Sequence, residues 1–76
     1  MFNSKSKKAR KEVEAIFNDI QINLENNYKD LAIGARKKAE KRLDELKQAG
    51  ELSDKDYAKL KVKMDDFTKR MKGYHH

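Results

Sequence analysis

The chain has 76 residues with a formal net charge of +6 at pH 7, and 42% of its residues are charged against 37% apolar. A chain this short buries only about 60% of the surface that its unfolded form exposes, so we expect one domain with a thin core and no catalytic cavity. The absence of cysteine excludes disulfides, thiolate nucleophiles and thiolate metal sites, and it suits a reducing compartment, for which we take the cytoplasm.

The first predicted helix covers about residues 6–25. Apolar residues recur there at steps of three and four, which places them on one helical face. They are Ala9, Val13, Ile16, Phe17, Ile20 and Leu24. Residues 1–10 are basic but are followed by Glu12 and Glu14 and not by an apolar stretch, so no signal peptide is visible. We expect residues 1–5 to be frayed. No part of the chain approaches the roughly 20 apolar residues that a membrane span requires.

The second predicted helix covers about residues 28–49, and its apolar face continues the same stepping. That face consists of Tyr28, Leu31, Ala32, Ala35, Ala39, Leu43 and Leu46. Gly34 lies inside the pattern, where glycine costs a helix about 1 kcal/mol relative to alanine. We therefore expect another helix to cross closely at Gly34.

The boundary between the first two helices depends on Asn26 and Asn27 alone. Asn27 is a suitable N-cap for the second helix, with Asp30 three positions later. The apolar steps nevertheless pass through both asparagines almost in phase, and one long helix would also satisfy them. In that alternative, a long helix and a short return helix leave an apolar strip uncovered, which predicts a dimer.

The third predicted helix covers about residues 54–72, and a complete turn precedes it. Gly50 can end the second helix in the left-handed conformation. Ser53 can cap the third helix by accepting from the backbone N–H of Asp56, whose carboxylate reaches back, while Leu52 packs on Tyr57. The apolar face of the third helix then contains Tyr57, Leu60, Met64, Phe67 and Met71.

These elements predict an all-α protein, a small antiparallel three-helix bundle that forms a single domain over residues 1–76. Residues 73–76 are expected to be frayed. The terminal His75 and His76 are interpreted as the remnant of a tag and receive no function. Neighbouring acidic residues such as Asp65 and Asp66 diverge around a helix, so no paired acid and base is present, and we expect neither an enzyme nor a cofactor.

The turn and its flanking helices, residues 43–64, resemble the short helical hairpin of the SHOCT family. The matching positions are Leu43, Leu46, Gly50, Leu52, Ser53, Asp56, Tyr57, Leu60 and Lys61. Members of that family are usually appended to other domains and have no established chemistry. The resemblance implies an association or tethering module.

Residues 36–71 are also similar to the long helical hairpin of ribosome recycling factor. The likeness includes an arginine-bearing helix, the Gly-Glu-Leu-Ser turn and a return helix rich in lysine. In that family the basic helix lies against ribosomal RNA. The resemblance implies that Arg36, Lys37 and Arg42 would contact phosphates, although the chain lacks the second domain of that family and most of the first.

Two basic blocks, at residues 5–11 and 36–42, form the first candidate site. Clustered cations in a protein with a net charge of +6 can neutralise phosphates. The candidate polyanion-binding residues are Arg10, Lys11, Arg36, Lys37, Lys41 and Arg42. The alternative is a solvated helical face, since lysine-rich helices carry such charge without binding anything.

The second candidate site is apolar. Ile22 and Ile33 fall off the main helical stripes, and with whatever the bundle leaves exposed of Phe17 they are the candidate partner-binding residues. The sequence therefore predicts a non-catalytic helical interaction module that acts in protein–protein association or tethering, with nucleic-acid binding through the basic face as the alternative. We expect a protein partner or self-association, a nucleic acid as the other candidate partner, and no small-molecule substrate.

Overall fold

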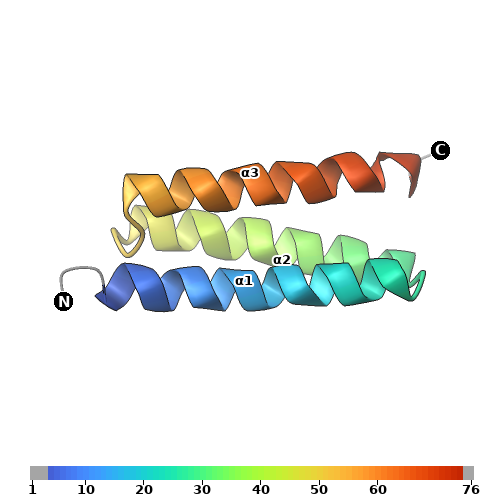
Figure 1. Cartoon of the computed structure of the whole chain (residues 1–76), viewed down its shortest axis with the longest axis horizontal. Helices are drawn as coiled ribbons and strands as arrows, with labels where there is room; N and C mark the ends of the chain where they lie inside the picture. The colour runs from blue at the N-terminus through green and yellow to red at the C-terminus, as the bar shows by residue number, and fades with distance from the viewer. Residues whose placement is uncertain (1–3, 75–76) are drawn as a thin grey trace.

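The computed structural model describes residues 4–74, which form three helices and a terminal 3-10 turn. Helix α1 is Ser4–Glu25, α2 is Lys29–Gln48 and α3 is Asp54–Arg70, and the 3-10 helix η1 is Met71–Tyr74. The helices lie side by side, with α2 running opposite to α1 and α3, in a bundle of 43 × 18 × 16 Å (Figure 1). The predicted all-α three-helix bundle is confirmed.

The predicted ends differ from the observed ones by a few residues. Ser4 and Lys5 belong to α1, and residues 73–74 belong to η1, so these four positions are helical where fraying was expected. The expectations for residues 1–3 and for His75 and His76 lie outside the described residues. Within residues 4–74, none of the helices combines the length and the apolar content needed to cross a membrane.

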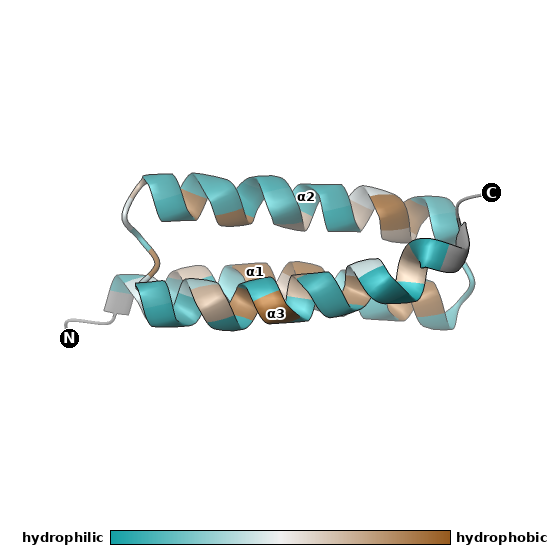
Figure 2. Ribbon diagram, turned by 90° about the horizontal axis from the view of Figure 1, so that it is seen from above, coloured by the Kyte–Doolittle hydropathy of each residue, from teal (hydrophilic) through white to brown (hydrophobic). Residues whose placement is uncertain are grey.

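The core lies along the axis of the bundle, where the apolar faces of the three helices meet. Hydrophobic segments recur at intervals along each helix in Figure 2, with hydrophilic segments between them. The most buried large side chains, including Ile20, Leu43 and Leu60, are at most 1% exposed. The buried apolar residues are Ala9, Val13, Ile16, Phe17, Ile20, Ala32, Ala39, Leu43, Leu46, Leu52, Leu60, Met64 and Met71.

Asn27 separates α1 from α2, which rules out the single long helix. Its φ of 63° is left-handed, a conformation that asparagine adopts more readily than most residues. The backbone N–H of Tyr28 donates to Asn23 O at 2.8 Å and that of Asn27 to Leu24 O at 3.1 Å, the paired bonds of a Schellman motif. Asn27 therefore ends α1 and does not cap α2 as expected; Tyr28 holds that position, without a side-chain cap bond.

Gly50 ends α2 with the same bonding pattern. Its φ is 72°, the N–H of Glu51 donates to Leu46 O at 2.9 Å, and the N–H of Gly50 donates to Lys47 O at 3.1 Å. The predicted helix end at Gly50 is confirmed.

Gly34 has no close neighbour. A methyl group at its Cβ position would meet no atom within 4 Å, so the expected close helix crossing is wrong at this position. The small side chain is therefore not required by packing within the bundle.

Alanine is expected to have opposite effects at the two glycines. Gly34→Ala should raise the free energy of unfolding by up to about 1 kcal/mol, because alanine is the better helix former and the site is open. Gly50→Ala should lower it by about 1 kcal/mol, because a Cβ is strained at positive φ. Urea denaturation of both variants measures the two changes, and a loss of stability in Gly34→Ala would contradict the open site.

Candidate functional site

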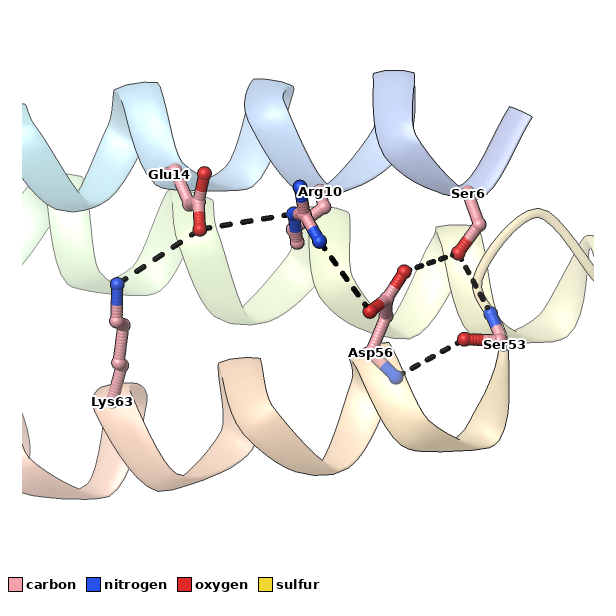
Figure 3. Close-up of polar contacts among 6 residues, drawn as sticks. All are labelled: Ser6, Arg10, Glu14, Ser53, Asp56 and Lys63. Carbon is pink, nitrogen blue, oxygen red and sulfur yellow. Dashed lines mark hydrogen bonds and ion pairs between the residues drawn. The ribbon is translucent and has the colours of Figure 1, made fainter. Parts of the chain in front are cut away.

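A polar junction ties the start of α1 to the start of α3 (Figure 3). The hydroxyl of Ser6, a residue only 7% exposed, donates to Asp56 Oδ2 at 2.6 Å and accepts from the backbone N–H of Ser53 at 3.1 Å. Ser53 Oγ accepts in turn from the N–H of Asp56 at 3.1 Å. Each bond satisfies a group at the N-terminus of α3, where backbone donors have no partner inside the helix.

Half of the predicted capping box is therefore formed differently. The bond from Asp56 N–H to Ser53 Oγ is present as expected. The return bond from the Asp56 carboxylate to Ser53 N–H is replaced, because Ser6 of α1 accepts from that N–H and donates to the carboxylate. The cap of α3 is thus a tertiary contact as well as a local one.

Arg10 extends the junction along the face where α1 and α3 meet. Its Nη1 lies 3.7 Å from Asp56 Oδ1, and its Nε lies 4.0 Å from Glu14 Oε2, which is 3.9 Å from Lys63 Nζ on α3 (Figure 3). Both distances from Arg10 exceed a hydrogen bond, and its buried Nε has no hydrogen-bond partner among the described residues. The guanidinium is therefore held loosely between two carboxylates.

The predicted polyanion-binding arginines all have carboxylate neighbours. Besides Arg10, Arg36 Nη1 lies 4.0 Å from Glu40 Oε1 on its own helix. Arg42 donates to both carboxylate oxygens of Glu12 on α1, from Nη2 at 3.1 Å, and from Nη1 to Glu45 at 3.3 Å. The pKa of Arg42 is raised by these bonds. The three arginines are thus engaged within the bundle.

The three predicted lysines of that set, Lys11, Lys37 and Lys41, remain exposed. Lys11 lies on α1, and Lys37 and Lys41 lie on α2. Lys41 lines a shallow hollow of about 240 Å³ together with Glu12 and Glu45, so the cations on this side are interleaved with carboxylates. The six residues do not form one uninterrupted basic surface.

The ion pair of Glu12 and Arg42 makes stability depend on acid pH. The hydrogen bond from Arg42 holds the pKa of Glu12 below its ordinary value of 4.5, so ionised Glu12 stabilises the folded state above that pH. The stabilisation is lost as the pH falls through the folded-state pKa of Glu12. Because the pair is exposed, the effect is modest.

Glu12→Gln is therefore expected to make the melting temperature fall less steeply than in the wild type between about pH 6 and about pH 3. Thermal melts by circular dichroism across that range measure the slope. Glu51→Gln is the control, since Glu51 forms no ion pair within residues 4–74. Equal slopes in Glu12→Gln and the wild type would contradict the assignment.

The three candidate partner-binding residues do not share one exposed surface. Phe17 is only 4% exposed, because its ring packs on Phe67 of α3 with the centroids 5.6 Å apart. Ile22 is 45% exposed on α1, and Ile33 is partly buried on α2. Phe17 therefore belongs to the core, and the two isoleucines lie on different helices.

Val62 is the large apolar side chain with the greatest exposure in the described residues, at 68%. It lines a cavity of about 490 Å³ between α1 and α3, together with Phe17 and the partly buried Phe67. Arg70 also lines this cavity, with its guanidinium 5.1 Å from the Phe67 ring centroid, and its Nη1 donates a 2.7 Å hydrogen bond to Gln21 of α1. An apolar hollow with a charged rim is thus open to solvent.

A second cavity, of about 420 Å³, lies between the first two turns of the same two helices. It is lined by Lys7 and Arg10 of α1 and by Lys55, Asp56 and Lys59 of α3. The two cavities follow one another along the same helix pair, and the ion pair of Glu14 with Lys63 belongs to the lining of the larger, apolar one. We call the two cavities together the α1–α3 groove, with a basic end at Lys7, Lys55 and Lys59 and an apolar end at Val62 and Phe67.

The candidate residues predicted from the sequence do not include this groove. Val62 lies off the stripe of core positions on α3, the same signal that singled out Ile22 and Ile33, and Lys55, Lys59 and Lys63 recur every four residues beside it. The spacing could have indicated one face of α3, but the sequence does not say that α1 lies against that face.

Neither a metal-binding cluster within the described residues nor a similar known protein points to a function for this chain. Residues 4–74 contain no group of three or more histidine, aspartate or glutamate side chains placed to hold a metal ion. No protein-family model, curated protein or solved structure matches the chain. The resemblances to the SHOCT hairpin and to ribosome recycling factor therefore stay predictions.

Proposed function

We propose that this protein is a non-catalytic helical interaction module that associates with, or tethers, a protein partner through the α1–α3 groove. The observation that carries the proposal is the position of Val62, 68% exposed at the edge of a cavity with Phe17 and Phe67 in its wall. A bundle of this size gains stability by burying such a side chain, so its exposure beside an open cavity favours a surface that a partner covers.

The composition of the apolar end also favours a protein partner. Interfaces between proteins combine a small apolar centre with a polar rim. Here Val62 and Phe67 form the centre, and the ion pairs of Lys63 with Glu14 and of Arg70 with Asp66 form the rim. The cysteine-free sequence supports the accompanying proposal of a reducing compartment, the cytoplasm.

Nucleic-acid binding is the weaker proposal. Lys11, Lys37 and Lys41 are exposed and could approach phosphates. However, Arg10, Arg36 and Arg42 all have carboxylate neighbours, and Arg42 would have to exchange the bonds that it makes to Glu12 and Glu45. We therefore place nucleic acid among the outcomes of the test.

The proposal is tested by placing a photo-crosslinking amino acid at position 18. Asn18 is an exposed residue that lines the apolar end of the groove from α1. Irradiation in an extract of the source cells is expected to give a discrete protein adduct that survives nuclease. Val62→Glu should abolish the adduct, because it puts a charge in the apolar hollow.

Leu31→Glu is the matched control, since Leu31 is a 60% exposed apolar residue on α2, outside the groove. It should leave the adduct unchanged. An adduct that nuclease removes would favour nucleic-acid binding, and no adduct at position 18, or equal loss in both variants, would contradict association through the groove.

A further inference from the structure

The basic end of the α1–α3 groove holds three lysines without a carboxylate partner. Lys7, Lys55 and Lys59 line its cavity, and none of them takes part in an ion pair within the described residues. The groove as a whole has six cationic side chains against three carboxylates, and all three carboxylates have a cation within 4.0 Å. The unneutralised positive charge of the groove thus gathers at one end.

Helix stability does not account for two of these lysines. Lys7 lies in the first turn of α1 and Lys55 in the first turn of α3. A cation at a helix N-terminus is unfavourable, because that end of the helix dipole is positive. The bundle therefore leaves the charges of Lys7 and Lys55 available to a partner that binds across the groove.

The spacing between the basic and apolar ends can be read along α3. Lys59 precedes Val62 by three residues and Lys55 precedes it by seven, which places their Cα atoms about 4.5 and about 10.5 Å from Val62 along the helix axis. A helix lying in the groove repeats these distances with its own residues three or four and seven positions apart.

We infer that the groove binds an acidic amphipathic helix of a partner protein, with an apolar side chain against Val62 and Phe67 and acidic side chains opposite Lys59 and Lys55. This inference rests on the proposed function and names the chemistry of the partner. Helices commonly bind by laying an apolar face into a groove between two other helices. Charge complementarity then sets the orientation and favours acidic partners over others.

A second copy of this chain does not fit the groove as well. Each copy has a net charge of +6, and its own α3 presents lysine every four residues beside Val62. Two such faces would bring like charges together, which is unfavourable. Polyphosphate chains fit less well too, because they would leave Val62 and Phe67 uncovered and would meet the carboxylates of Glu14 and Asp66.

The test is selection from a random 16-residue peptide library displayed on phage. The wild-type protein is the bait, and Val62→Glu is used for counter-selection, so that peptides bound outside the apolar end are discarded. The enriched peptides are expected to share an apolar anchor with glutamate or aspartate three or four and seven positions away. One enriched peptide is then synthesised, and its affinity is measured by fluorescence anisotropy.

The double variant Lys55→Glu with Lys59→Glu is expected to lower the affinity for that peptide at least about tenfold at low salt. Both attractive contacts with acidic side chains of the peptide then become repulsive. The double change removes cations from the N-terminal half of α3 and should not unfold it. Lys37→Glu with Lys41→Glu is the matched control, because it changes the net charge equally on exposed residues of α2 and should alter affinity by less than about twofold.

The outcomes separate this inference from the proposed function. Peptides that depend on Val62 but lack acidic residues, or that bind equally well after the double change at Lys55 and Lys59, would overturn the acidic partner and leave association through the groove standing. If the selection yields no peptide whose binding depends on Val62, both the acidic partner and association through the groove are overturned. Displacement of the acidic peptide by a single-stranded oligonucleotide with higher affinity would replace the protein partner with a nucleic acid.

Discussion

Ile20→Ala is expected to lower the free energy of unfolding by about 3 kcal/mol, the largest effect of any single change considered. Ile20 is fully buried and belongs to the core between the three helices. The change removes the transfer free energy of the lost methyl and methylene groups, and it leaves a cavity that the surrounding side chains fill only in part. In a domain of this size, whose total stability is roughly 4 to 11 kcal/mol, the loss is severe.

Ile22→Ala is the matched control for this prediction. It is the same substitution two residues further along α1, at a position that is 45% exposed. We expect a change of less than about 0.5 kcal/mol, because little apolar surface returns to water and alanine is the better helix former. Urea titrations of both variants, followed by circular dichroism, give the two values. Similar losses at both positions would contradict the orientation of α1 in the bundle.

Ser6→Ala is expected to lower the free energy of unfolding by about 1.5 kcal/mol, although it removes a single oxygen atom. The hydroxyl of Ser6 satisfies the backbone N–H of Ser53 and one carboxylate oxygen of Asp56 at the same time. Its loss leaves a partly buried donor and a partly buried charge with fewer partners, and an unsatisfied buried group costs about 1–3 kcal/mol. The gain in helix propensity from alanine offsets a part of this cost.

A double-mutant cycle isolates the contact. The effects of Ser6→Ala and Asp56→Ala on the free energy of unfolding should be non-additive by about 1 kcal/mol, because either change alone breaks the same hydrogen bond. The control cycle pairs Ser6→Ala with Asp54→Ala, a carboxylate in the same first turn of α3 whose side chain is fully exposed. That pair should be additive within about 0.5 kcal/mol. Equal coupling in both cycles would show that Ser6 acts only through the charge of the turn.

Two places along the chain show how local sequence signals can be right or incomplete. At Gly50 and Ser53 the helix end and the bond from Asp56 N–H to Ser53 Oγ were predicted correctly, because both depend on residues at most five positions apart, whereas the predicted return bond of the Asp56 carboxylate is replaced by Ser6. At Asn27 the same kind of signal was ambiguous. Asparagine can cap the next helix or adopt the left-handed conformation that ends the previous one, and both fit the same residues.

The site residues were predicted less accurately than the helices, because a site depends on which helix faces pack against one another. Arg42 looked available for phosphate until Glu12, 30 residues earlier in the chain, was found to accept from its guanidinium. Phe17 was a candidate for an exposed contact and is covered by Phe67. Val62 was one apolar residue among lysines, and it becomes the edge of a cavity only because α1 passes beside it.

The sequence by itself determined the apolar helical faces and the turn at Gly50, because helical periodicity and capping act between residues within a few positions of one another. It left open whether the chain breaks at Asn27, and the structure shows that it does. The tertiary structure alone decided that Ser6 completes the cap of α3 from 50 residues away and that the groove lies between α1 and α3. The physical reason is that burying three apolar faces together favours one arrangement of the helices. That arrangement determines which charged side chains lie close enough to form ion pairs and which remain available to a partner.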